Sequence, residues 1–211
     1  MAKNKHINVD VKDVLKTVLV LALIAIVSGG LLGGINAVTY ISDDEMISRK
    51  MVNLYTADSF INLSTTADEN FAVEKEIVNK YNKGSKNPSL ALLPVKNGAV
   101  EENTVIYRVY GAGDYDCTLL VLVVDDKITK ISVYSSSATP GIGDKAYKDT
   151  YIKQFNGLNL ITAEPFVVVK NNASKDNEVN AVAGATKSSE AVKNAVNNAM
   201  ALHKLLKGEA K

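Results

Sequence analysis

Three small residues precede a threonine in the segment Asn180–Val196, NAVAGATKSSEAVKNAV. Ala183, Gly184 and Ala185 leave the backbone accessible to a bulky group, and Thr186 follows where a hydroxyl is expected to cap the first turn of a helix. The start of a helix favours anions, because its free N–H groups and the helix dipole both attract negative charge. The segment therefore predicts either an ordinary helix cap or an anion site beside a hydroxyl.

A second stretch, residues 135–143 with the sequence SSSATPGIG, combines hydroxyl groups with a Pro-Gly turn and a further glycine. Such a loop can lie flat against a planar ligand, and an ordinary surface turn is the alternative. A third stretch, Gly111-Ala-Gly113, is similar to the start of a dinucleotide-binding fingerprint. Its third glycine would fall at Asp116 and the strand–turn–helix context is missing, so we interpret it as a turn.

Cysteine and histidine are too few for several kinds of chemistry. The chain has one cysteine, Cys117, and two histidines, His6 and His203, at opposite ends of the sequence. This excludes an intrachain disulfide, a multi-cysteine zinc site, an iron–sulfur cluster and a c-type haem. Any redox chemistry would therefore need an organic cofactor. Because His203 is the only histidine after the predicted anchor, a Ser/His/acid hydrolase is also disfavoured. Cys117 lies in an apolar run and is predicted to be a small core residue.

The distribution of charge gives no sign of a nucleic-acid partner. The formal net charge of the 211 residues is +1, and basic and acidic residues are mixed along the chain. A nucleic-acid-binding protein is expected to gather lysine and arginine in a patch or stripe.

Residues 17–42 contain no charged residue and are long enough to cross a bilayer, which predicts one transmembrane helix over 17–41. Residues 1–16 would then form a cytoplasmic N-terminus and residues 42–211 an extracytoplasmic domain, in contact with membrane lipid only through the anchor. This orientation follows from the flanking charges: Lys3, Lys5, Lys12 and Lys16 before the span, and Asp43, Asp44 and Glu45 after it. A cleaved signal peptide is the alternative, but its apolar region is normally shorter.

After the anchor, residues 44–81 are predicted to be helical with interruptions near 62–68. Three runs rich in β-branched and aromatic residues, 104–110, 117–124 and 128–134, predict an antiparallel meander, with a hairpin turn at Asp125-Asp126-Lys127. Residues 166–170 predict a further strand. The apolar spacing from Val192 to Leu206 predicts an amphipathic helix. Helices and strands are segregated along the chain, so the fold class is α+β.

The order of an anchor, Thr139-Pro-Gly-Ile-Gly-Asp-Lys145, Gln154-Phe-Asn-Gly157 and Ala183-Gly-Ala-Thr-Lys-Ser-Ser189 resembles the covalent FMN-binding subunits of bacterial respiratory complexes. Within that family the chain is most similar to the G subunit of the Rnf ion-translocating ferredoxin:NAD oxidoreductase. The C subunit of the sodium-translocating NADH:quinone reductase is the alternative, and a noncatalytic membrane-anchored sensor or scaffold is another.

The resemblance implies an electron-transfer flavoprotein whose FMN is joined through its phosphate to a threonine, here Thr186. It implies a complex with other membrane and peripheral subunits that couples ferredoxin oxidation and NAD reduction to Na⁺ or H⁺ translocation. It also implies a flavin transferase for maturation and a loop, Thr139–Gly143, near the flavin. The cofactor-binding residues that it implies are Thr139, Pro140, Gly141, Gly143, Gly184, Ala185, Thr186, Lys187 and Ser188.

Three positions depart from the family pattern. The pattern has Asp six residues before the acceptor, Ser or Thr three before it, and Glu just before Thr-Pro-Gly. This chain has Asn180, Ala183 and Ala138 at these positions. The missing acid and hydroxyl would affect recognition by the transferase, while the acceptor threonine is present.

Overall fold

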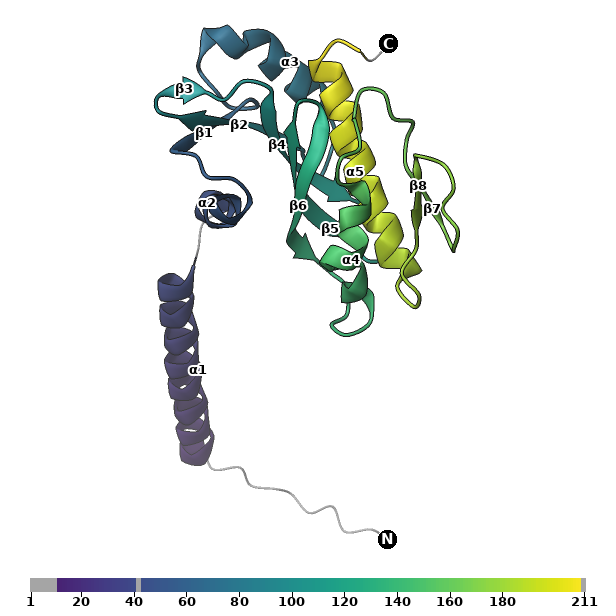
Figure 1. Ribbon diagram of the computed structural model, residues 1–211. Helices are drawn as coiled ribbons and strands as arrows, with labels where there is room; N and C mark the ends of the chain where they lie inside the picture. The colour runs from purple at the N-terminus through teal and green to yellow at the C-terminus, as the bar shows by residue number, and fades with distance from the viewer. Residues whose placement is uncertain (1–10, 41–42, 210–211) are drawn as a thin grey trace. The chain divides into compact units, whose positions relative to one another are not determined.

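The computed structural model describes residues 11–40 and 43–209. The chain divides into two compact units, Met1–Met46 and Ile47–Lys211, and each is described by itself (Figure 1).

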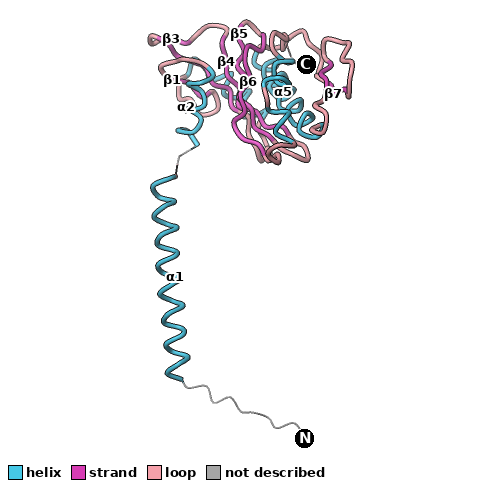
Figure 2. Tube along the Cα trace, turned by 60° about the horizontal axis from the view of Figure 1, so that its bottom comes forward, coloured by secondary structure: helices cyan, strands magenta, loops and turns pink. Residues whose placement is uncertain are grey.

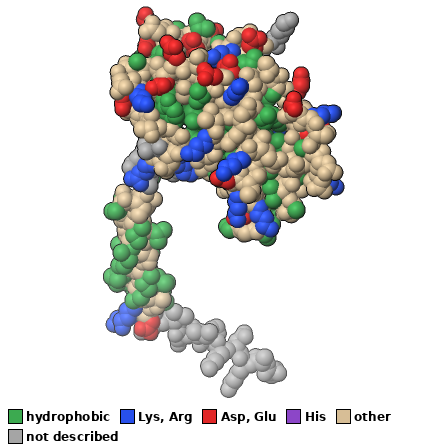
Figure 3. All heavy atoms as spheres, in the orientation of Figure 1, with side chains coloured by type: hydrophobic (Ala, Val, Ile, Leu, Met, Phe, Trp, Pro, Cys, Tyr) green, Lys and Arg blue, Asp and Glu red, His purple; other side chains and the backbone are tan. Residues whose placement is uncertain are grey.

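The first unit contains helix α1, Val11–Thr39, whose described side chains are all exposed. Apolar side chains cover much of its surface, and charged side chains gather at its N-terminal end (Figure 3). By length and composition the helix is able to cross a membrane. It begins six residues before the predicted span and ends at Thr39, while Ile41, and the lysines Lys3 and Lys5 used for the orientation, lie outside the described residues.

The second unit is an α+β domain built on one antiparallel sheet, as the sequence predicted. Its strands follow the order β1-β2-β4-β5-β6, and the short β3 pairs with β2. The strands are β1 Ser59–Asn62, β2 Leu90–Lys96, β3 Ala99–Val100, β4 Thr104–Gly111, β5 Cys117–Val124 and β6 Lys127–Ser136. The predicted β5–β6 hairpin is confirmed: Asp125 and Asp126 have φ values of 48° and 63°, which suit a two-residue turn between twisted strands.

Helices cover both faces of the sheet (Figures 1 and 2). They are α2 Asp43–Leu54, α3 Ala72–Tyr81, α4 Asp149–Ile152 and α5 Thr186–Leu206, with the 3₁₀ turns η1 Glu69–Phe71, η2 Gly143–Tyr147 and η3 Lys153–Phe155. Because successive strand residues face opposite sides, β4 sends Tyr107 and Val109 into the core under α5, and Ile106 toward α2. The two sides of the sheet therefore carry separate apolar clusters.

Helix α5 lies against the sheet with the face that the sequence predicted. Val192, Ala195, Val196, Ala199 and Leu202 are buried, and Leu206 is half-buried against the same cluster. The spacing of these residues places them on one side of the helix, so their burial fixes how α5 is rotated on the sheet.

The Gly111-Ala-Gly113 segment differs from the predicted turn, because Gly111 is the last residue of β4. A Cβ atom on Gly111 would lie 1.9 Å from the carbonyl oxygen of Ala191 in α5. The glycine therefore allows the helix backbone to approach the end of the strand closely, and the turn begins only after it.

Neither β2 nor β3 was predicted, and two further segments differ from the prediction. Residues 59–62 lie in the stretch predicted to be helical, but they pair with β2 as strand β1. The strand predicted at 166–170 is present as β7 Val167–Val169, but it forms a separate two-stranded parallel sheet with β8 Glu178–Asn180. Both differences depend on strand partners distant in sequence, which local propensity does not identify.

Candidate functional site

The two glycine-containing stretches of the sequence meet at the start of α5. They enclose a pocket of about 270 Å³. Its lining residues are Tyr115, Ile142, Gly143, Gly184, Ala185, Thr186, Lys187 and Ser188. Six of the nine residues predicted for the site therefore line one cavity. Thr139, Pro140 and Gly141 belong to the adjoining loop and do not line it.

Thr186 is the first residue of α5 and is exposed, so its predicted role as the N-cap is wrong. Ala185 occupies the cap position and provides no side-chain cap. Gly184 has a φ of 76°, a left-handed conformation that glycine adopts without strain. The chain turns at this glycine, so the helix cap falls at Ala185, one residue before the predicted cap Thr186. Among the residues that the structure describes, none forms a hydrogen bond with the Thr186 hydroxyl, so this group is not committed to the helix.

The hydroxyl that ties down this turn belongs to Ser189. Its Oγ donates to the carbonyl of Ala185 at 3.0 Å and accepts from the N–H of Val182 at 3.1 Å. The Ser189 carbonyl also accepts a hydrogen bond from the Tyr151 hydroxyl at 2.9 Å. Ser189 therefore has a structural role, which the sequence did not distinguish from that of its neighbour Ser188.

Ser188 is fully buried and its Oγ has no hydrogen-bond partner among the described residues. A neighbouring hydroxyl belongs to Tyr147, whose pKa is raised mainly by burial, while its interaction with Ser188 acts in the opposite direction. Buried polar groups in folded proteins are nearly always paired, so the Ser188 hydroxyl is available to a hydrogen-bond partner at the pocket.

The loop before the pocket is a tight turn. The Thr139 carbonyl accepts hydrogen bonds from the N–H groups of Ile142 at 3.3 Å and Gly143 at 3.0 Å. Gly141 has a φ of 81°, and a Cβ there would meet nothing within 4 Å. A Cβ on Gly143 would instead lie 2.8 Å from Ser188 Oγ. Gly141 thus supplies a backbone conformation, whereas Gly143 leaves the space that the pocket needs.

Tyr115 forms a wall of the pocket that the sequence did not predict. It lies in the loop between β4 and β5, and 39% of its surface is exposed. The ion pair between Asp114 and Lys187, with 3.0 Å between oxygen and nitrogen, holds this loop beside the first turn of α5. The Tyr147 hydroxyl donates to the Tyr115 carbonyl at 3.3 Å. In the sequence, the only feature that pointed to this part of the site was the turn-like composition of the loop that contains Tyr115.

Ile142, which is 60% exposed, also lines the pocket. The lining thus combines two large apolar side chains, Tyr115 and Ile142, with the first residues of α5 and the Ser188 hydroxyl. Such a combination suits a ligand with a flat apolar part and an anionic end.

Cys117, beneath this region, is buried as predicted. Burial raises the pKa of its thiol to about 12, and the neighbouring carboxylate of Asp116 contributes in the same direction. The thiol is therefore protonated at neutral pH and is not a nucleophile. Within residues 11–40 and 43–209 no group of three or more His, Cys, Asp or Glu side chains could hold a metal ion.

The three departures from the family pattern lie around the pocket without lining it. The Gln154 side chain hydrogen-bonds both backbone groups of Asn180, at 2.9 Å and 3.2 Å, and the Asn180 side chain accepts from the N–H of Ala173. Ala183 is exposed. Ala138 lies next to Gly143, since a Cβ atom added to Gly143 would be only 2.9 Å from the Cβ of Ala138. Asn180 therefore has a structural use in this chain.

Comparison with known proteins gives a family match over this region and similar structures. Residues 113–201, from the Tyr115 loop into α5, match the FMN-binding domain family. The solved structure of NqrC from Shewanella oneidensis aligns with a TM-score of 0.49 at 20% identity, over 76% of this chain and 87% of that one. The corresponding protein of the Na⁺-translocating NADH-quinone reductase from Parabacteroides distasonis aligns with the same TM-score and identity, over 80% and 85%. No curated protein sequence matches the chain.

Proposed function

Because residues 113–201 match the FMN-binding domain family, we propose that this chain is a flavoprotein that carries FMN in the pocket at the start of α5. The FMN is joined by a phosphoester bond between its phosphate and Oγ1 of Thr186. The observation that carries the proposal is the pocket itself, in which an uncommitted threonine hydroxyl lies beside a buried, unpaired serine hydroxyl.

The residues of the pocket fit the phosphate end of FMN. The N–H groups of Thr186, Lys187 and Ser188 have no acceptor within the helix, because the first turn lacks preceding carbonyls. They are at the positive end of a 21-residue helix, and no carboxylate of the described residues lines the pocket. Ser188 Oγ would donate to a phosphate oxygen, which removes the cost of a buried unpaired hydroxyl.

The exposed rim of the pocket fits the ring end. Tyr115 and Ile142 offer apolar surface on two sides, and an aromatic side chain stacks well on a planar ring system. Bound FMN supplies the electron-transfer chemistry, and the chain holds and orients it. A covalent attachment would keep the FMN in place outside the cytoplasm, where a lost cofactor could not readily be replaced.

The wider role is an electron-transfer subunit of an ion-translocating membrane complex of the Rnf type, as the motif order suggests. In this proposal α1 is a single-pass anchor, the domain from residue 42 lies outside the cytoplasm, and a flavin transferase attaches the cofactor. The support is the apolar helix together with a flavin-type pocket in one chain.

The test is flavin attachment to the full chain, produced together with a flavin transferase. The wild-type chain should fluoresce in a denaturing gel, and its intact mass should rise by the mass of FMN less one water. Thr186→Ala should lose both signals while remaining folded, because Thr186 is exposed and caps nothing. Thr150→Ala, also exposed and outside the pocket, is the matched control and should keep both signals.

Retention of covalent flavin in Thr186→Ala would refute the assignment of the acceptor and direct attention to Ser188. A wild-type chain that takes up no flavin would instead favour the sensor or scaffold alternative. The native complex is then purified and assayed for electron transfer with ferredoxin and with quinone, which distinguishes the Rnf-type complex from the quinone reductase.

A further inference from the structure

A second cavity lies at the other end of α5. Its volume is about 260 Å³, and it is enclosed by β2, β4, the η1–α3 region and the last turn of α5. His203, which lines it, follows Thr186 by 17 residues in α5, a distance of about 26 Å along a helix. The cavity is therefore separate from the proposed flavin pocket.

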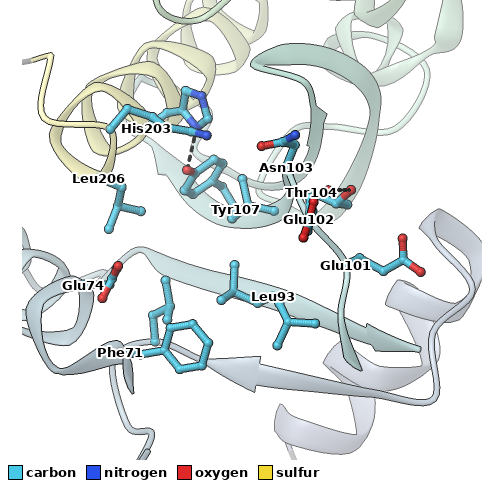
Figure 4. Close-up of a pocket in the computed structure, with 14 residues that line it drawn as sticks. Phe71, Glu74, Leu93, Glu101, Glu102, Asn103, Thr104, Tyr107, His203 and Leu206 are labelled. Carbon is cyan, nitrogen blue, oxygen red and sulfur yellow. Dashed lines mark hydrogen bonds between the residues drawn. The ribbon is translucent and has the colours of Figure 1, made fainter. Parts of the chain in front are cut away.

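Half-buried apolar side chains form its walls. Figure 4 shows Phe71, Leu93 and Leu206 converging on the same space from three different elements. Leu63 and Val105, both buried, also line it. This apolar surface belongs to the edge of the main core and remains open to solvent on one side.

The polar groups at the base of the cavity are satisfied by one another. The Tyr107 hydroxyl lies 2.8 Å from Nδ1 of His203 (Figure 4). Nε2 of His203 lies 3.0 Å from a carboxylate oxygen of Asp126. Lys207 pairs with the same oxygen of Asp126 at 3.4 Å. These described side chains leave no unsatisfied polar group at the base of the cavity, which therefore suits an apolar guest.

The rim carries an excess of negative charge. Three glutamates line the cavity, Glu74, Glu101 and Glu102, against one lysine, Lys207. Glu101 interacts with the Tyr55 hydroxyl. Among the described residues, Glu74 and Glu102 form no ion pair with Lys207, which pairs with Asp126 instead. A partner that places positive charge at this rim would therefore meet two available carboxylates.

We propose that this cavity is a docking site for a partner polypeptide, which inserts one leucine-sized or aromatic side chain flanked by lysine or arginine. The apolar walls and the internally paired polar groups favour an apolar side chain, and the two available carboxylates at the rim complement flanking positive charge. An apolar anchor in a pocket with a charged rim is a common form of protein interface. The proposal does not depend on flavin binding.

The experiment uses the full chain in lipid nanodiscs, with ¹³C-labelled leucine and valine methyl groups. The probe is the blocked tripeptide Lys-Leu-Lys, and the matched probes are Lys-Ala-Lys and Glu-Leu-Glu. Lys-Leu-Lys should cause saturable shifts in the methyl signals of Leu93, Val100 and Leu206. Lys-Ala-Lys should bind at least about tenfold more weakly, because most of the buried apolar area is lost. Glu-Leu-Glu should cause no saturable shift.

Three variants test the rim. Glu74→Gln and Glu102→Gln should each weaken binding of Lys-Leu-Lys by about two- to fivefold, as expected for solvent-exposed ion pairs. Glu164→Gln, an exposed acid outside this cavity, should leave binding unchanged. Added salt should weaken binding to the wild type, and less so to the rim variants.

Val100→Phe should fill the cavity from its edge and abolish the shifts in a folded spectrum, and if this variant does not fold, the glutamate variants decide. Equal binding of all three peptides would overturn the proposal. A short fatty acid that shifts the same methyl signals more strongly than Lys-Leu-Lys would also overturn it, in favour of a lipid chain. Shifts that depend on protein concentration alone would overturn it in favour of self-association.

Discussion

Gly143→Ala is the substitution that most directly tests how the pocket is built. The added Cβ would lie 2.8 Å from Ser188 Oγ and 2.9 Å from the Cβ of Ala138. Real Cβ contacts are longer than this, and neither neighbour is the end of a long flexible side chain, so backbone must move. Overpacking of this kind costs about 1–3 kcal/mol of unfolding free energy.

Gly141→Ala is the matched control, because it lies two residues away in the same loop. Nothing lies within 4 Å of its added Cβ, but its φ of 81° is unfavourable for alanine and costs about 1–2 kcal/mol. The two variants should therefore lose similar stability. Only Gly143→Ala should also lose flavin loading, since Gly143 lines the pocket and Gly141 does not.

Ser188→Ala provides a second check through a double-mutant cycle. Alone it should raise the stability of the flavin-free chain by about 1 kcal/mol, because it removes the cost of a buried hydroxyl that has no partner among the described residues. Combined with Gly143→Ala it should restore part of the lost stability, with a coupling of about 0.5–3 kcal/mol. The clash with Ala138 would remain, so recovery should be incomplete.

The assay is pulse proteolysis of the full chain in urea, with flavin loading measured on the same samples by absorbance. Additive effects of Gly143→Ala and Ser188→Ala would refute the reasoning about their contact. Equal flavin loading in the Gly141 and Gly143 variants would refute the assignment of Gly143 to the pocket lining.

Three further predictions concern other parts of the chain. Tyr115→Leu should lengthen the flavin fluorescence lifetime, because a stacked tyrosine quenches an excited flavin, and an unchanged lifetime in loaded protein would remove the tyrosine from the ring site. Burial lowers the pKa of His203 below 6.5 despite its hydrogen bond to Asp126. The unfolded chain therefore takes up a proton first as pH falls below about 6.5, so urea stability should fall there, and His203→Gln should flatten that dependence. A cysteine replacing Ser85, with Cys117 changed to Ala, should react with an impermeant thiol reagent in intact cells, and labelling only after lysis would reverse the orientation.

Local sequence patterns were sufficient where the structure depends on neighbours in the chain. The period of two in the strands, the Asp125-Asp126 turn and the apolar face of α5 all follow from short-range rules, and all are present in the structure. The apolar run that predicted an anchor likewise forms one helix, Val11–Thr39. The α+β class followed from the order of these elements.

The pairing of strands required contacts that no local pattern encodes. Residues 59–62 form a strand because β2 offers them backbone partners, and β7 finds its partner in β8 instead of in the main sheet. Both pairings depend on hydrogen bonds to a second segment that is not adjacent in the chain, and the local sequence of one strand does not identify that segment.

For the candidate site, residue types and spacing were enough to identify the chemical groups: a threonine, two serines and small residues at the start of a predicted helix, and a glycine turn elsewhere. How these groups are used depends on the folded chain. The fold brings Gly143 against Ser188, adds Tyr115 through a loop held by an ion pair, and assigns the capping position to Ala185. It also gives Ser189 a structural hydrogen bond to Ala185 and leaves the Ser188 hydroxyl without a partner among the described residues. The physical reason is that hydrogen-bond satisfaction and free volume are properties of the packed chain, whereas residue type and spacing are properties of the sequence.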